Sequence, residues 1–105
     1  MIMLYYNEGN WSPVLVCDVC QQRITRRHTG MAVGGVLPND GNPELEPLLH
    51  AHKGECLDEA ERRLGKGSAV GTDELAFHLA CLVHNVGLTP EQLSRSRASY
   101  DEMGF

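Results

Sequence analysis

Two cysteines separated by two residues, Cys17 and Cys20, are followed by a histidine and a third cysteine, His52 and Cys56. Thiolate sulfur and imidazole nitrogen are the donors that Zn²⁺ prefers, and this cysteine spacing lets both sulfurs face one point. His52 is the expected fourth ligand because it lies four residues before Cys56, whereas His50 would need a wider loop. The pattern predicts one structural Zn²⁺ per chain.

The pair Cys17 and Cys20 has a second interpretation, a redox-active dithiol of the thioredoxin type. Such a pair normally opens a helix inside a βαβ unit, whereas residues 13–16, Pro-Val-Leu-Val, predict a strand that runs into the first cysteine. A catalytic zinc would leave one position to water, and four available donors favour a closed structural site. Cysteines in ligand spacing without an export signal also predict a cytoplasmic protein.

The elements that must position these donors are a strand, a hairpin and a helix. Residues 22–26 and 31–36 predict the two strands of a hairpin, residues 37–47 a loop, and residues 56–64 a helix that ends at Gly65. This order predicts an α+β fold with a treble-clef-like zinc finger. A linker-like stretch then divides a zinc-finger module, residues 1–66, from a C-terminal helical extension, residues 67–105, within one compact domain.

The extension is predicted to contain two helices. Thr72 can cap the first, over residues 73–86, and Thr89 with Gln92 forms a capping box for a second that begins at Pro90 and ends near residue 100.

Apolar residues lie on two sides of the predicted helix 73–86, which implies burial on two sides. Leu75, Leu79, Leu82, Val83 and Val86 form the stripe expected to face the core. The other side is covered either within the chain or by a homodimer or protein partner, and the candidate partner-binding residues are Phe77, Cys81 and His84. A second metal site at His78, Cys81 and His84 is disfavoured, because steps of three residues drift around the helix.

Nine basic and 14 acidic residues give a net charge of −5. Proteins that mainly bind nucleic-acid phosphates usually carry a basic excess, so nucleic acid is a possible but disfavoured partner. No apolar run is long enough to span a membrane, and no membrane partner is expected. Two short basic stretches are either solvated edges or a phosphate-contacting patch, and their members are Arg23, Arg26, Arg27, His28, Arg62 and Arg63.

Two motifs resemble those of small bacterial and phage-type zinc-finger proteins, namely Cys17-Asp18-Val19-Cys20 and His52-Lys53-Gly54-Glu55-Cys56. Those proteins carry a Cys-Asp-x-Cys knuckle, a hairpin and a His-Lys-x-Cys-like close. The resemblance covers roughly residues 11–65, and this chain has one extra residue between the histidine and the last cysteine. It implies a treble-clef-like fold with bound zinc, in a group whose members are mostly of unassigned function.

Three functions follow from these observations. The first is a non-enzymatic adaptor or regulator, favoured by the acidic balance and the lack of a recognisable catalytic motif. The second is a nucleic-acid-binding regulator that uses the basic residues named above. The third is a zinc hydrolase or finger-type nuclease, which would need an open zinc position or further ligands drawn from His50, His78 and His84.

Overall fold

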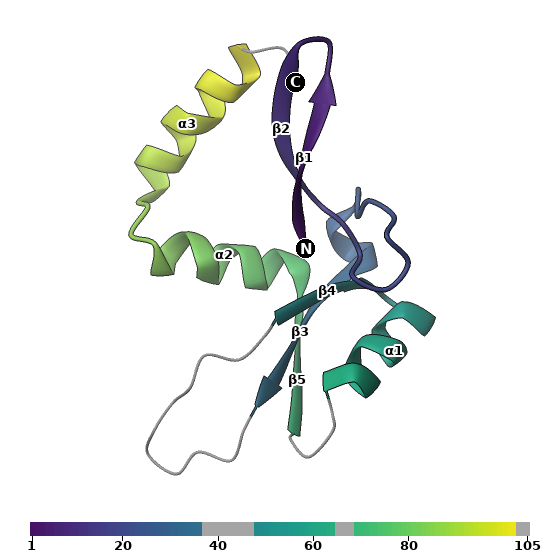
Figure 1. Cartoon of the computed structure of the whole chain (residues 1–105). Helices are drawn as coiled ribbons and strands as arrows, with labels where there is room; N and C mark the ends of the chain where they lie inside the picture. Colours follow the sequence, from purple (N-terminus) through teal and green to yellow (C-terminus); the bar gives the residue numbers. More distant parts are fainter. Residues whose placement is uncertain (37–47, 65–68, 103–105) are drawn as a thin grey trace.

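The computed structural model describes residues 1–36, 48–64 and 69–102. Its elements, in chain order, are β1 (Ile2–Asn7), β2 (Asn10–Leu15), the 3-10 turn η1 (Arg27–Thr29), β3 (Gly30–Val36), β4 (Leu48–His52), α1 (Glu55–Leu64), β5 (Ala69–Glu74), α2 (Leu75–Asn85) and α3 (Pro90–Glu102). They form two small antiparallel sheets, β1-β2 and β4-β3-β5, with helices around them (Figure 1). The predicted α+β class is confirmed.

The first sheet is a hairpin with a tight turn. Asn7 pairs with Asn10, and the two residues between them, Glu8 and Gly9, have φ values of 48° and 86°. Positive φ at both central residues is the geometry that twists a two-residue turn in the sense its strands require. The Asn-Glu-Gly-Asn run therefore forms the turn that joins β1 to β2.

The second sheet corrects the predicted hairpin. β3 pairs with β4 on one side and β5 on the other, whereas within residues 22–26 only Arg23 forms an isolated bridge, to Val16. The physical reason lies in β3, where consecutive residues Ala32 and Val33 are both buried. A strand covered on both faces belongs in the middle of a sheet and takes a partner along each edge.

The start of α2 is also corrected. Thr72 does not cap a helix, because it lies in β5 opposite Val33, and the helix begins at Leu75 after Glu74, which makes no side-chain cap hydrogen bond. Pairing with the free edge of β3 therefore decides the conformation of Thr72, and the local capping signal does not.

The domain division at residue 66 stays a prediction. Its junction at 65–68 and the predicted loop 37–47 lie outside the described residues, and β5 beyond the junction joins the same sheet as β3.

Other local signals are confirmed. α1 covers Glu55–Leu64 and packs on β3 and β4. α3 begins at Pro90, where the Gln92 N–H donates to Thr89 Oγ1 (3.1 Å) and the Thr89 N–H donates to Gln92 Oε1 (2.9 Å). These two bonds are the predicted capping box. α3 then runs beside the hairpin, where Ser12 Oγ and Tyr100 OH lie 3.0 Å apart (Figure 1).

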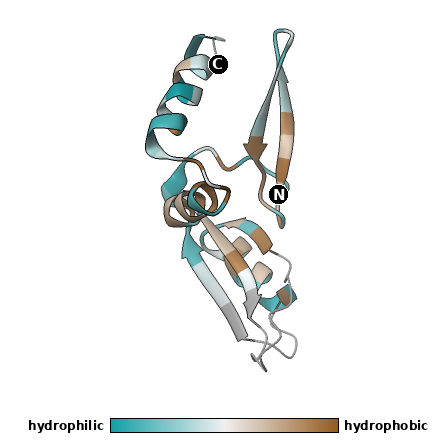
Figure 2. Cartoon of the chain, turned by 90° about the vertical axis from the view of Figure 1, so that its left-hand side faces the viewer, coloured by the Kyte–Doolittle hydropathy of each residue, from teal (hydrophilic) through white to brown (hydrophobic). Residues whose placement is uncertain are grey.

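The hydrophobic core is small and centres on the β4-β3-β5 sheet. Its buried members are Cys17, Ile24, Val33, Ala51, Ala60 and Leu75. One of the four candidate metal ligands therefore belongs to the core itself. Figure 2, which looks along α2, shows apolar residues on that helix and on the hairpin, outside this core.

Gly30 provides a test of the packing between β3 and α2. A Cβ at this position would lie 2.9 Å from Ile24 Cγ2 and 3.2 Å from Leu75 Cδ2. Gly30→Ala is expected to lower the free energy of unfolding by about 1–3 kcal/mol, because both neighbours are buried and must move. Urea unfolding of the metal-loaded protein measures the change.

Gly34→Ala on the same strand is the matched control. Among the residues that the structure describes, its Cβ would meet Leu48 Cδ1 alone, at an ordinary 3.7 Å. We expect stability to be unchanged or raised by less than about 1 kcal/mol, since alanine restricts the unfolded chain. Equal losses in the two variants would contradict the close approach at Gly30.

Candidate metal centre

The first two candidate ligands, Cys17 and Cys20, lie on a tight turn that is held by backbone hydrogen bonds. The Cys17 N–H donates to the Gln22 carbonyl (2.8 Å), and the Gln21 N–H donates to the Cys17 carbonyl (3.0 Å). Gln21 adopts the left-handed conformation, with φ of 64°. The Cys20 N–H lies 3.5 Å from Cys17 Sγ. The backbone therefore curls around the first sulfur and brings the second beside it.

The other two ligands come from the end of β4 and the start of α1. His52 is the last residue of β4, and Cys56 is the second residue of α1. Gly54 stands between them with φ of 94°, a left-handed conformation that a residue with a side chain adopts only at a cost. This glycine turns the strand directly into the helix, so that the imidazole and the thiol face the same space.

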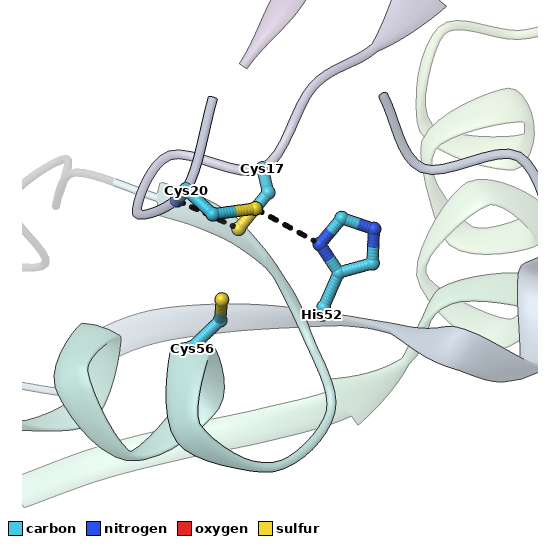
Figure 3. Close-up of side chains that lie close together, drawn as sticks. All are labelled: Cys17, Cys20, His52 and Cys56. Atoms are coloured by element: carbon cyan, nitrogen blue, oxygen red, sulfur yellow. Dashed lines mark hydrogen bonds between the residues drawn. The ribbon is translucent and has the colours of Figure 1, made fainter. Parts of the chain in front are cut away.

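The four side chains converge on one point (Figure 3). The ligand atoms of Cys17, Cys20, His52 and Cys56 all lie within 4.8 Å of one another, and Cys20 Sγ is 3.4 Å from His52 Nδ1. A tetrahedral zinc with Zn–S and Zn–N distances of about 2.3 and 2.0–2.1 Å separates its donors by about 3.5–3.8 Å. The cluster therefore fits a metal ion after small side-chain movements.

The thiols of this cluster differ in acidity in the metal-free protein. Burial raises the pKa of Cys17, but hydrogen bonds from the backbone of Cys20, His52 and Val19 and from the His52 side chain outweigh it and lower the pKa to about 6. Burial and the neighbouring sulfurs of Cys17 and Cys20 raise the pKa of Cys56 to about 11. The Cys17 thiol is thus largely deprotonated near neutral pH, whereas Cys56 must lose its proton when a metal binds.

Asp18 lies in the knuckle, the turn formed by residues 17–20, and connects this turn to β4. The Asp18 N–H donates to the His50 carbonyl (2.8 Å), and the His50 N–H donates to Asp18 Oδ2 (2.8 Å). The Met1 ammonium forms an ion pair with the same oxygen at 2.9 Å, and Arg63 of α1 donates to the Asp18 carbonyl at 3.2 Å. Knuckle, strand and helix are therefore connected without the metal.

Burial raises the pKa of Asp18, but the Met1 ammonium and the His50 N–H outweigh it, so the pKa lies below its usual value. Asp18 is a positioning residue that sequence reasoning missed. The only sequence signal was its place between the two cysteines.

His50 is directed away from the metal cluster and has a different partner. It is buried, its Nδ1 lies 3.3 Å from the Met1 ammonium, and its Nε2 lies 3.2 Å from His78 Nε2 on α2. Because an ammonium only donates, Nδ1 accepts, and the proton on Nε2 is donated to His78. Burial, followed by the ammonium and His78, lowers the pKa of His50 to about 4. Neutral His50 therefore links β4 to α2.

The remaining candidate residues do not assemble into a second metal site. Among residues 1–36, 48–64 and 69–102, the Cys17 cluster is the sole group of three or more potential ligands. Phe77 and His84 are exposed, and Cys81 is half-buried. The stripe predicted to face the core is largely exposed as well, because Leu79, Leu82 and Val86 point to solvent.

The basic residues are divided between two places. Arg23, Arg26, Arg27 and His28 are all exposed near η1, and the Arg23 guanidinium lies 5.0 Å from the Tyr5 ring centroid. On α1, Arg62 and Arg63 both form ion pairs with Glu59. Glu59 thus offsets part of the positive charge that a phosphate-contacting patch would require there.

Comparisons with protein-family models, with curated proteins and with solved structures give no match. None of the helices in the described part of the chain is long and apolar enough to cross a membrane.

Asp18→Asn tests the attachment of the knuckle. The amide keeps the shape but loses the charge that holds the Met1 ammonium and strengthens the bond from the His50 N–H. We expect about tenfold weaker metal binding, as for other residues that orient ligands without touching the metal. Competition titration with a chromophoric chelator measures the affinity.

Asp73→Asn, on the exposed part of β5, makes the same charge change away from the cluster and should leave the affinity unchanged. If both variants bound metal as tightly as the unaltered protein, the positioning role of Asp18 would be wrong.

Proposed function

We propose that this chain is a small, non-enzymatic zinc-binding protein that acts as a protein-interaction adaptor or regulator, with one structural Zn²⁺ per chain. The observation that carries the proposal is the convergence of three thiols and one imidazole within 4.8 Å. This donor set suits Zn²⁺, because soft thiolates and imidazole in a tetrahedral arrangement favour zinc over the hard cations Ca²⁺ and Mg²⁺.

The order of elements around the cluster supports a treble-clef-like arrangement. A knuckle carries Cys17 and Cys20, the antiparallel strands β3 and β4 follow, and α1 carries Cys56 in its first turn. The same order supports the proposed kinship with small bacterial and phage-type zinc-finger proteins.

A structural role suits both the position of the cluster and the size of the core. The ligands join three segments, the knuckle, β4 and α1, and Cys17 is itself part of the core. Structural zinc contributes on the order of 10 kcal/mol to small domains, comparable with their whole stability. Four protein donors also fill the tetrahedral positions that a catalytic zinc would share with water.

The interaction role rests on the surface of α2. This helix contains no Asp, Glu, Lys or Arg, and Phe77, with 61% of its surface exposed, projects from it into solvent. Large exposed apolar patches on small proteins are typical of sites where another macromolecule binds.

Cobalt substitution distinguishes a structural from a catalytic metal. Co²⁺ bound by Cys17, Cys20, His52 and Cys56 should give the intense visible bands of a tetrahedral thiolate site. Addition of azide should leave the spectrum unchanged, because no coordination position is open. A shift of the bands on adding azide would favour the zinc-enzyme alternative.

Cysteine variants test which thiols bind. Native mass spectrometry should find one zinc per chain in the unaltered protein, and Cys56→Ser should lose it together with much of the N-terminal fold. Cys81→Ser is the matched control, since this half-buried cysteine on α2 lies outside the cluster. Retention of zinc in Cys56→Ser, or its loss in Cys81→Ser, would contradict the ligand assignment.

A further inference from the structure

The apolar surface of α2 is much larger than the part that the chain covers. Leu75 is its only fully buried residue, at the start of the helix. Beyond it, large apolar side chains are exposed on two sides, Phe77 on one and Leu79 and Leu82 on the other, where Val86 just past the end of the helix is 64% exposed. Because the helix contains no Asp, Glu, Lys or Arg, this exposed surface is poor in charge and costly to hydrate.

The hairpin has a second exposed apolar face. Ile2, Leu4 and Tyr6 alternate along β1, and Trp11 of β2 pairs with Tyr6, so the four share one face. The rings of Tyr6 and Trp11 are 4.8 Å apart, yet Trp11 is 61% exposed. Ser12, the next residue of β2, lies on the opposite face, where it contacts α3. A two-stranded sheet is only marginally stable unless something covers it.

The area of the whole chain indicates how much surface is left uncovered. The accessible surface is 7701 Å², whereas a compact monomer of 11.6 kDa exposes about 5,800 Å². The radius of gyration is 15.7 Å, against about 13 Å for a compact domain of this length. Both values exceed those of a compact monomer, the surface of all 105 residues by about 1,900 Å².

We propose that a second copy of this chain covers the exposed surfaces of α2 and the hairpin, forming a two-fold homodimer. The inference rests on the proposed interaction role and names its partner. Interfaces between permanently associated copies are large, apolar and poor in charge, as these surfaces are. A permanently exposed apolar surface also needs a partner that is always present in equal amount, and the chain itself meets that condition.

Other occupants fit the surface less well. Helices that bind membrane surfaces carry Lys and Arg along a polar face, and α2 has neither residue. Nucleic acid requires positive charge at the contact, and the chain has a net charge of −5.

Sedimentation equilibrium of the unaltered zinc-loaded protein is the first test, and it needs no variant. We expect a mass of about twice 11.6 kDa at micromolar concentration. Zinc content is measured on the same sample. A monomer that carries one zinc overturns the homodimer and leaves the zinc assignment standing, whereas a dimer without zinc overturns the zinc assignment and supports the homodimer.

Phe77→Glu tests the location of the interface. A carboxylate buried without a partner should weaken dimerisation by at least about a hundredfold. The control is Ala98→Glu on the exposed polar surface of α3, which adds the same charge and should remain dimeric. A Phe77→Glu protein that is folded and still fully dimeric overturns the assignment to the side of α2 that carries Phe77.

Trp11 reports on the hairpin without any substitution there, because it is the only tryptophan in the chain. If the second copy covers it, its fluorescence is blue-shifted in the dimer and moves to longer wavelength on dilution and in Phe77→Glu. An emission spectrum typical of exposed tryptophan in the intact dimer overturns the part of the proposal that places the hairpin in the interface.

Discussion

The structure depends on bringing four donor atoms from three separate segments to within 4.8 Å of one another. Each segment reaches that point for a local reason: the curled knuckle for Cys17 and Cys20, the end of β4 for His52, and the left-handed Gly54 that opens α1 for Cys56. The central strand β3 supports this arrangement, because it holds β4 in place and α1 packs on both strands. With so few buried side chains elsewhere, the cluster and the core are effectively one feature.

Two histidines of β4 show how position decides chemical role. His50 and His52 are two residues apart, yet His52 contacts Cys20 Sγ, while His50 is buried against the Met1 ammonium and His78. Asp18 accounts for the difference, because its backbone and carboxylate take both backbone hydrogen-bonding groups of His50. This pairing places the knuckle beside His50, so that His52, two residues further along β4, lies next to the sulfurs of Cys17 and Cys20.

Local signals and ligand chemistry were readable from the sequence, and the pairing of distant strands was not. The capping box of Thr89 and Gln92 involves residues close in the chain, and the donor types alone predicted that two distant ligand pairs would meet; both predictions agree with the structure. Thr72 carried an equally clear local signal, yet β5 pairs with β3, some forty residues away. Sequence periodicity also identified the apolar residues of α2 without identifying which of them the chain itself covers, so Leu79 and Val86 were expected in a core and are exposed.

The N-terminal and C-terminal parts of the chain are therefore stabilised by different interactions. Toward the N-terminal side the cluster, β3, β4 and α1 support one another. In α2 only Leu75 is fully buried, and in the described part of α3 no residue is. Isolated helices of 11 and 13 residues are marginal in water, and the capping box and a Ser12–Tyr100 contact add little apolar burial. Under the proposed function and the proposed dimer, the stability of the N-terminal half is linked to metal and that of the C-terminal helices to association.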